Sequence, residues 1–384
     1  MPAFAAVMTG TGTGAIATIQ IYGDSATDIL KQIFVPQTQK TPEYNTGQIL
    51  LGTITYGAET IDQVTIGCEA ADTFAINCHG NPLIVEGIMQ LLKKQGVELI
   101  TSEQLLIRTA AESNTIALEA KLTLPKARTI EGTKLILNQI DSGLTAVTKK
   151  WLASPPDKIR DDAKKIIQSS QIAKFLVFGC RIVLAGPPSS GKSTLLNRLA
   201  GSQKAIVTSI KGTTRDWVSA ECRIGELSIE LIDTAGFGER PADDIDKAAQ
   251  RATAHIINQA DLILLVLDNS EPVEQLTDGL MKSTAGKKIL TVINKSDLPA
   301  RFDAARLSGN LTSCGVQTSA LLGTGIDALS EKICEITGVK TFDSQQPIYF
   351  TRRQQELVAS LANAYSQDKA RMIITELLSG RLSV

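Results

Sequence analysis

The sequence predicts an α/β fold: a doubly wound parallel sheet in the middle of the chain, inserted between two helical segments and preceded by an α+β segment. Three observations predict it. Residues 179–340 alternate short β-branched runs with helical stretches, residues 106–178 and 341–384 show helical periodicity, and residues 1–105 mix both patterns. Because two helical segments flank the middle one, we favour a single helical domain that the middle segment interrupts. The alternative is that the helical segments cap different domains.

The N-terminal segment predicts strands and one helix. β-Branched runs at residues 15–22, 48–56, 63–69 and 73–78 indicate four strands. Residues 82–95 repeat apolar side chains at helical spacing, and Gly96 ends the pattern. This segment is therefore predicted to be a small α+β domain.

The flanking segments predict helices. Residues 131–151 place an apolar stripe on one helical face, and Ser154-Pro155-Pro156 ends it. A second helix is expected over 159–175, and two more amphipathic stretches follow Thr351. These segments are expected to pack together by their apolar stripes.

The middle segment predicts strands at residues 181–185, 228–232, 262–267 and 289–293. Strands that alternate with helices form parallel sheets with helices on both faces. Short polar motifs follow these strands, and open α/β sheets bind ligands at the carboxyl ends of their strands. We therefore expect the chemistry of this protein at that sheet edge.

Composition sets limits on function. The chain has 384 residues, 43% of them hydrophobic, and a formal net charge of −1. Two or three soluble domains are expected, and nucleic acid would need a local basic patch because no global positive field exists. Six dispersed cysteines without a C-x-x-C pair indicate reduced thiols in a cytosol. Cys78-His79 and Cys68 lack two further ligands for a metal site.

Neither secretion nor membrane insertion is expected. The N-terminus MPAFAAVMTGTG has no basic region of the kind that opens a secretory signal. No apolar run reaches the roughly 18 residues of a membrane span. The protein is therefore expected to be cytoplasmic.

The first motif is GPPSSGKS at residues 186–193, which matches the phosphate-binding pattern G-x-x-x-x-G-K-[ST]. Its backbone N–H groups, at the start of a helix, would surround phosphates. Lys192 would bind the β and γ phosphates, and the hydroxyl of Ser193 would ligate Mg²⁺. The residues expected to supply the N–H groups are Ser189, Ser190, Gly191, Lys192, Ser193 and Thr194.

The second motif is DTAG at residues 233–236. Asp233 would reach the same Mg²⁺ through water, and the N–H of Gly236 would face the γ phosphate. Upstream, the stretch GTTRD at 212–216 offers two threonines. Thr213 is expected to contact the nucleotide, and Thr214 is our choice for Mg²⁺ and for catalysis.

The third motif is NKSD at residues 294–297. The carboxylate of Asp297 can accept two N–H groups of guanine, which adenine cannot supply, and Asn294 and Lys295 complete the base site. Ser319-Ala320 lies where a backbone N–H could meet the guanine carbonyl. Together the motifs predict a P-loop G domain that binds GTP and GDP and hydrolyses GTP.

Catalysis leaves alternatives open. Phe237 follows DTAG, where many GTPases carry a Gln that orients water, so slow hydrolysis is expected. An acidic cluster, Asp243, Asp244 and Asp246, lies downstream; each member is either a solvated surface group, which we favour, or a group that holds water. Arg215 is either a charge stabiliser or a surface residue.

Longer stretches give a family resemblance. AIVTSIKGTTRD, IELIDTAGF, DDIDKAAQRA and QADLILLVLD are similar to the MnmE/TrmE family of tRNA-modification GTPases. The N-terminal stretches GTGTGAIATIQIYG and CHGNP resemble the opening strand and the H-G-G-P step of that family. The order of domains also agrees with it.

The resemblance implies several properties. It implies a homodimer through the first domain, a folate site there, a K⁺ ion at the GTPase centre, and a flavoprotein partner with which the family modifies the wobble uridine of certain tRNAs. Asp246 aligns with the catalytic Glu of the family, and Ser189 with its K⁺-binding Asn. Main-chain carbonyls near Thr208 and Ile210 would add to the K⁺ site.

The chain departs from the family elsewhere. The folate-contacting Arg, Glu and Lys of the family align with Gln20, Ala71 and Asn114, so folate is not an expected cofactor. The sequence ends in Arg381-Leu-Ser-Val without the family's Cys-x-Gly-Lys. Two functions stay open: a slow GTP hydrolase that assists tRNA modification, and a GTP-dependent conformational switch that acts on a protein or ribosomal partner.

Overall fold

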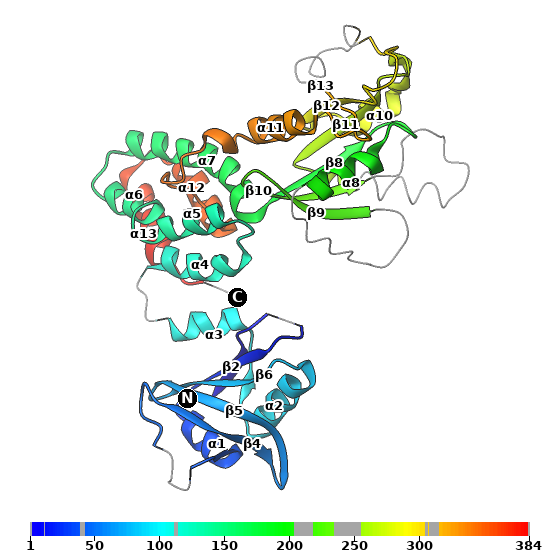
Figure 1. Cartoon of the computed structure of the whole chain (residues 1–384). Helices are drawn as coiled ribbons and strands as arrows, with labels where there is room; N and C mark the ends of the chain where they lie inside the picture. Colours follow the sequence, from blue (N-terminus) through cyan, green and yellow to red (C-terminus); the bar gives the residue numbers. More distant parts are fainter. Residues whose placement is uncertain are drawn as a thin grey trace. The chain divides into compact units, whose positions relative to one another are not determined.

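The structure is a computed structural model that describes residues 2–10, 12–38, 43–110, 114–202, 218–233, 255–303, 306 and 315–382. The chain divides into two compact units, Met1–Leu118 with Arg381–Val384 and Glu119–Gly380 (Figure 1). The four domain limits proposed above remain a prediction. In the described part of the chain, no helix combines the length and the hydrophobicity that crossing a membrane requires.

The first unit is built on a seven-stranded sheet. Its strand order is β3-β4-β5-β6-β2-β1-β7, and only the β1–β7 pair is parallel. The four predicted strands are confirmed as β2, β4, β5 and β6. The strands are β1 (Phe4–Val7), β2 (Ile16–Tyr22), β3 (Phe34–Pro36), β4 (Ile49–Tyr56), β5 (Glu59–Ala70), β6 (Thr73–His79) and β7 (Glu98–Leu99).

The helices α1 (Ala26–Ile33), α2 (Pro82–Lys94) and α3 (Ser102–Thr109) accompany this sheet. The predicted helix over 82–95 is confirmed as α2, which begins where Asn81 Oδ1 accepts the N–H of Leu83 at 3.0 Å. Alternating side chains of the strands and the apolar stripes of α1 and α2 form one core. This unit is therefore a sheet covered by helices, as an α+β domain requires.

The second unit opens with helices. They are α4 (Thr115–Thr123), which begins in the first unit, the 3-10 turn η1 (Leu124–Lys126), α5 (Ile130–Asp141), α6 (Leu144–Trp151) and α7 (Pro156–Phe178). The prediction of a single helix over 131–151 was wrong, because the chain breaks at Gly143. A Cβ on Gly143 would lie 2.3 Å from Gln139 Oε1, which instead accepts the N–H of Leu144 at 2.8 Å. Gln139 thus ends one helix and caps the next.

Helices from the end of the chain pack against these early helices. They are α12 (Arg352–Leu361) and α13 (Gln367–Ser379); α12 packs on α7, and α13 on α6. A buried carboxylate, Glu119 of α4, accepts hydrogen bonds from Arg353 at 2.8 Å and 3.0 Å and from Gln354 at 2.7 Å. The bundle therefore joins sequence from both sides of the middle segment.

The middle segment forms a six-stranded sheet in the order β13-β12-β11-β8-β10-β9. The strands are β8 (Cys180–Ala185), β9 (Val218–Ile224), β10 (Leu227–Asp233), β11 (Leu262–Asp268), β12 (Ile289–Asn294) and β13 (Val316–Gln317). The accompanying helices and 3-10 turns are α8 (Lys192–Ser202), η2 (Val273–Gln275), α10 (Asp278–Thr284), α11 (Ile326–Thr337) and η5 (Val339–Thr341).

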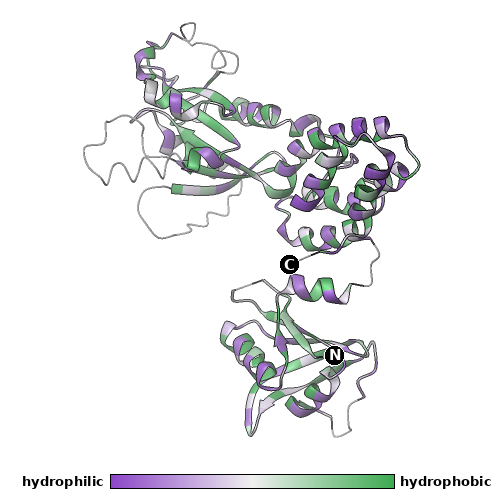
Figure 2. Cartoon of the chain, turned by 180° about the vertical axis from the view of Figure 1, so that it is seen from behind, coloured by the Kyte–Doolittle hydropathy of each residue, from purple (hydrophilic) through white to green (hydrophobic). Residues whose placement is uncertain are grey.

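The four predicted strands are confirmed as β8, β10, β11 and β12, and they run parallel. The sheet also contains strands that were not predicted: β13, parallel to β12, and β9, which is antiparallel. β9 pairs antiparallel with β10 through a tight turn, from Leu227↔Ile224 to Asp233↔Val218. Every residue of β11 is buried, as a central parallel strand requires, and Figure 2 shows the sheet strands as largely hydrophobic. The parallel strands β8, β10, β11 and β12 end at one common edge, where the three motifs begin.

Candidate nucleotide-binding site

The loop after β8 is shaped by glycines. Gly191 has φ +91°, and a Cβ there would lie 2.3 Å from Asn294 Nδ2. Gly186 approaches the end of β11 so closely that a Cβ would lie 2.2 Å from Val266 O. Ser189 also takes a left-handed conformation, with φ 61°. The loop therefore curves tightly over the sheet edge before α8 begins at Lys192, which is the geometry that presents backbone N–H groups to an anion.

Lys192 lies inside this loop. Its side chain is buried, and Nζ donates to the carbonyl oxygens of Pro187 at 2.8 Å and Gly186 at 3.1 Å. Burial lowers the pKa of Lys192, and the carboxylate of Asp233 partly offsets that effect. The lysine is thus held by main-chain oxygens and can turn toward a phosphate without loss of core packing.

Ser193 and Asp233 meet beneath the loop. Ser193 Oγ donates to Asp233 Oδ2 at 2.5 Å, which joins the first turn of α8 to the end of β10. Two buried oxygens of the loop and of the end of β10, Ser190 Oγ and Asp233 Oδ1, have no hydrogen-bond partner among the described residues. Hydroxyl and carboxylate oxygens are the ligands that Mg²⁺ prefers, so this donor set fits the ion.

Asn294, at the end of β12, connects the loops. Its Nδ2 donates to Ser190 O at 2.9 Å, and its Oδ1 accepts from Ala320 N at 3.0 Å and Thr318 Oγ1 at 3.2 Å. The sequence predicted Asn294 as a base contact, and the structure adds this bridge between the phosphate loop and the Ser319-Ala320 loop. The N–H of Ala320 is engaged here, so a guanine carbonyl would share it or replace Asn294.

Lys295 and Asp297 follow Asn294 at the sheet edge. Lys295 has φ 62°, and its Nζ binds Asp268 Oδ2 at 2.6 Å. Burial would raise the pKa of Asp268, but hydrogen bonds from Lys295 and Ser270 outweigh it and hold that pKa below its ordinary value. Asp297 is exposed, so its carboxylate is accessible to a base.

Two residues that position this site were not predicted as members of it. Arg198 of α8 donates to Ala320 O at 3.0 Å and to Leu321 O at 2.6 Å, so it holds the Ser319-Ala320 loop against α8. Asp268 ends β11, and its place at a strand end was the only signal for it in the sequence. Arg198 lies beyond the motif and carries no such signal.

The structure brings together the predicted residues of the loop after β8, Asp233 and the residues after β12. Ser319 and Ala320 join them through Asn294. Thr194 lies in the first turn of α8 and is exposed. Six predicted residues lie outside the described residues, namely Thr208, Ile210, Thr213, Thr214, Gly236 and Asp246.

Comparisons with known proteins agree with this geometry. The family described as "50S ribosome-binding GTPase" matches residues 181–295, and the family described as "GTP-binding protein TrmE N-terminus" matches residues 3–104. The protein named tRNA modification GTPase MnmE of Lacticaseibacillus paracasei is 28% identical over 91% of this chain and 84% of its own length. The protein of the same name from Ligilactobacillus salivarius is 29% identical over 90% of this chain and 83% of its own length.

These matches support membership of the MnmE/TrmE family. The two family matches fall on the two sheets, and the similarity to the MnmE proteins covers about nine tenths of the chain. Among solved structures, the G domain of the T. maritima FeoB iron transporter is 29% identical over 41% of this chain and 98% of that chain, with a TM-score of 0.34. With this motif set, the match to a GTPase family and the similarity to tRNA modification GTPases, the chain is a P-loop GTPase.

Proposed function

We propose that this chain binds GTP with Mg²⁺ at the edge formed by β8, β10 and β12, and that its hydrolysis serves the modification of tRNA. The observation that carries the proposal is the meeting of Lys192, Ser193, Asp233 and Asn294 at that one edge. The similarity to proteins named tRNA modification GTPases, which extends over nine tenths of the chain, supports the tRNA part.

Phosphate binding would use charge and main-chain N–H groups. Lys192 would exchange its two carbonyl partners for phosphate oxygens, a stronger interaction because both partners are then charged. The N–H groups at the start of α8 would add the helix dipole. Ser193 and Asp233 would hold the Mg²⁺, which neutralises phosphate charge in such sites.

Base selection would rest on Asp297. A carboxylate accepts the two N–H groups that guanine presents and that adenine lacks. Asn294 would position the Ala320 loop and the phosphate loop at the same time, since its amide contacts both. GTP and GDP are therefore the proposed ligands, with ATP excluded.

For hydrolysis we propose a role for K⁺ and for pairing of two G domains in a homodimer. The family resemblance supports both, with Asp246 and Thr214 as the groups near the attacking water and Ser189, Thr208 and Ile210 near the ion. Ser189 offers a hydroxyl in place of an amide oxygen, so the monovalent-ion site would be weak. A flavoprotein partner belongs to the same proposal.

We propose that folate is not a cofactor. Gln20 replaces a cation of the family site, and its Nε2 donates to Glu69 Oε2 at 2.5 Å, so this amide is already engaged. Ala71 offers no carboxylate. Calorimetry with a tetrahydrofolate and the full chain tests this: absence of binding is expected, and micromolar binding would refute it.

The proposed function is tested in two steps. Purified protein should hydrolyse GTP and not ATP, and Ser193→Ala should lose the Mg²⁺-dependent activity. In a bacterial strain that lacks its own tRNA modification GTPase, expression of this chain should restore modified wobble uridine, measured by mass spectrometry of tRNA digests. If the protein hydrolyses GTP but does not restore the modified uridine, the proposed GTPase activity stands and the proposed role in tRNA modification is refuted. The conformational switch would then be the favoured function.

A further inference from the structure

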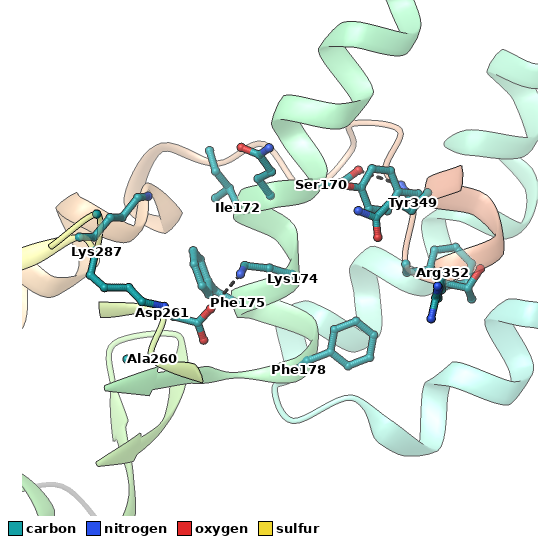
Figure 3. A pocket seen from close by; sticks show the side chains of 16 residues that line it. Ser170, Ile172, Lys174, Phe175, Phe178, Ala260, Asp261, Lys287, Tyr349 and Arg352 are labelled. Carbon is teal, nitrogen blue, oxygen red and sulfur yellow. Dashed lines mark hydrogen bonds and ion pairs between the residues drawn. The ribbon is translucent and has the colours of Figure 1, made fainter. Parts of the chain in front are cut away.

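A cavity of about 810 Å³ lies in the second unit, at the opposite edge of the sheet from the nucleotide site. Its walls are α7, the residues that precede β11 and β12, and the segment that enters α12 (Figure 3). The parallel strands separate it from the phosphate loop by about 20 Å, the length of a six-residue strand. Its volume falls in the range of ligand pockets, about 300–1,000 Å³.

The cavity is cationic. Four basic side chains line it, Lys174, Lys287, Lys288 and Arg352, against one carboxylate, Asp261. That carboxylate is used internally, because its oxygens accept from Lys174 Nζ at 2.8 Å and from Arg181 N at 3.0 Å. The whole chain has a net charge of −1, so this local excess of positive charge is a feature of the cavity and not of the protein.

Two of these cations are available to a ligand. Lys287 Nζ contacts the main-chain oxygen of Asn258, and Lys288 is exposed; among the described residues neither forms an ion pair. Arg352 pairs with Glu356 in an exposed contact at 2.8 Å, a kind of ion pair that contributes little and yields readily.

Aromatic rings complete the wall. Phe178, the last residue of α7, is 40% exposed, and Tyr349, which also lines the cavity, is partly exposed. Figure 3 shows Phe178 and Tyr349 on the same side of α7 as Arg352, whereas Lys287 and Asp261, toward which Lys174 turns, lie on the other side of that helix. Exposed rings next to cations are what proteins use to stack a nucleobase and bind its phosphate.

We propose that this cavity is a second nucleotide-binding site, which takes a base with its phosphate independently of guanine recognition. Phe178 or Tyr349 would stack on the base, and Lys287, Lys288 and Arg352 would bind phosphate oxygens. The ligand could be supplied by an unpaired stretch of RNA or by a free nucleotide, since the two present the same chemistry.

The test uses the full chain saturated with GDP and Mg²⁺, so that the first site is occupied. The probe is a short fluorescein-labelled oligouridylate, measured by anisotropy, with uridine monophosphate as competitor. The variants are the double Lys287→Glu/Lys288→Glu and the single Phe178→Leu, which keeps an apolar side chain but removes the ring. The matched control is Lys164→Glu, an exposed lysine on the same helix outside the cavity.

We expect both cavity variants to bind the probe about tenfold more weakly or worse, and the control to bind as the wild type does. Binding of the wild type should fall with salt by about 0.7 log units per log unit for each phosphate bound. Competition by uridine monophosphate at equal concentration would identify a free nucleotide as the ligand, and its failure would identify RNA. Equal binding by all variants, equal weakening by Lys164→Glu, or absence of binding would overturn the proposal.

GTP hydrolysis separates this inference from the proposed function. None of the substituted residues contacts the phosphate loop, so hydrolysis should stay at the wild-type rate in every variant. Unchanged thermal unfolding would show that the variants fold. A protein without GTPase activity that still binds the probe would refute the proposed function and leave this site intact.

Discussion

Single residues at the sheet edge combine charge with burial. Lys192→Ala should weaken GTP and GDP binding by about 10- to 150-fold, because hydrogen bonds between charged groups contribute about 1.5–3 kcal/mol. The fold should persist, since within the described part of the chain the hydrogen bonds of Nζ go only to carbonyl oxygens of the loop. Isothermal calorimetry and thermal unfolding measure the two effects, with Lys164→Ala as control. Hydrolysis at the wild-type rate in Lys192→Ala would mean that the site lies elsewhere.

Asp297 should decide which base is bound. In Asp297→Asn the acceptor pair becomes one donor and one acceptor, which matches the extra carbonyl of xanthine better than the amino group of guanine. The variant should therefore lose affinity for GDP and gain it for xanthosine diphosphate. Competition titrations with both nucleotides measure the shift. Equal affinity of the wild type for ATP and GTP would contradict the assignment of this loop.

The carboxylate of Asp268 should contribute to the free energy of unfolding, and its contribution should depend on pH. Its pKa is held below the ordinary 3.8 in the folded chain, so its contribution is present above pH 3.8 and is lost as pH falls through the folded pKa. The free energy of unfolding of the wild type should exceed that of Asp268→Asn at neutral pH, and the difference should shrink in acid. Urea titrations over a pH series measure it. A difference that grows in acid would show that the carboxylate is not stabilised by Lys295.

At the scale of elements, α4, α12 and α13 depend on one buried ion pair. Arg353→Leu should destabilise the chain by about 3–5 kcal/mol, because it leaves the carboxylate of Glu119 buried and unpaired. Arg353 also donates to Glu376 O at 2.9 Å at the end of α13, so that helix should loosen as well.

The neighbouring Arg352 gives a matched control for this prediction. Arg352→Leu removes an exposed pair with Glu356 and should have a much smaller effect on stability. Urea unfolding of both variants compares them. Equal losses would show that the Glu119 network is not what holds these helices.

The sequence predicted most elements because their periodicity was strong, and its errors have physical causes. Asp141-Ser142-Gly143 is a turn signal inside an apolar stripe that continues across it, so two helices resembled one. β9 pairs through a tight turn at Gly225, with φ 58°, which gives an antiparallel neighbour that strand composition alone does not distinguish. A local sequence pattern predicts that a segment forms a helix or a strand, but it does not predict which other element that segment pairs with.

Only those site residues that belong to recognisable sequence motifs could be predicted from the sequence. The motifs have spacings that nucleotide binding requires, and the structure brings their key residues to one edge of the sheet. These residues are Lys192, Ser193, Asp233 and Asn294. The bridge from Asn294 to Ser190 and the contact from Arg198 to Ala320 depend on how loops pack, which no spacing encodes. Sequence therefore indicated the ligand better than it indicated the residues that position the loops.

At the scale of the whole molecule, hydrolysis should be slow and only weakly dependent on K⁺. Phe237 cannot orient water, and Ser189 offers a poorer ion ligand than the Asn of the family. Turnover of the wild type and of Asp246→Ala, in KCl and in NaCl at matched ionic strength, tests this. We expect a modest difference between the salts and a lower rate in Asp246→Ala.

Two outcomes would contradict that expectation. A large acceleration of the wild type by K⁺ would disprove the weakened ion site. A GTP turnover rate in Asp246→Ala equal to that of the wild type would indicate that Asp246 is a solvated surface group without a catalytic role. Asp243→Ala, in the same acidic cluster, is the matched control.

The pairing of Glu119 with Arg353 also has a consequence for how the newly made chain matures. The partners are 234 positions apart, so a ribosome that adds about 5–20 residues each second makes Arg353 roughly 10–50 s after Glu119. Over that interval the early helices lack the partners that bury their apolar stripes. The sheet of residues 180–317 is complete before α12 emerges, so it can fold first. Holdase chaperones should therefore bind the nascent chain at α4–α7, and release it only when the last helices arrive.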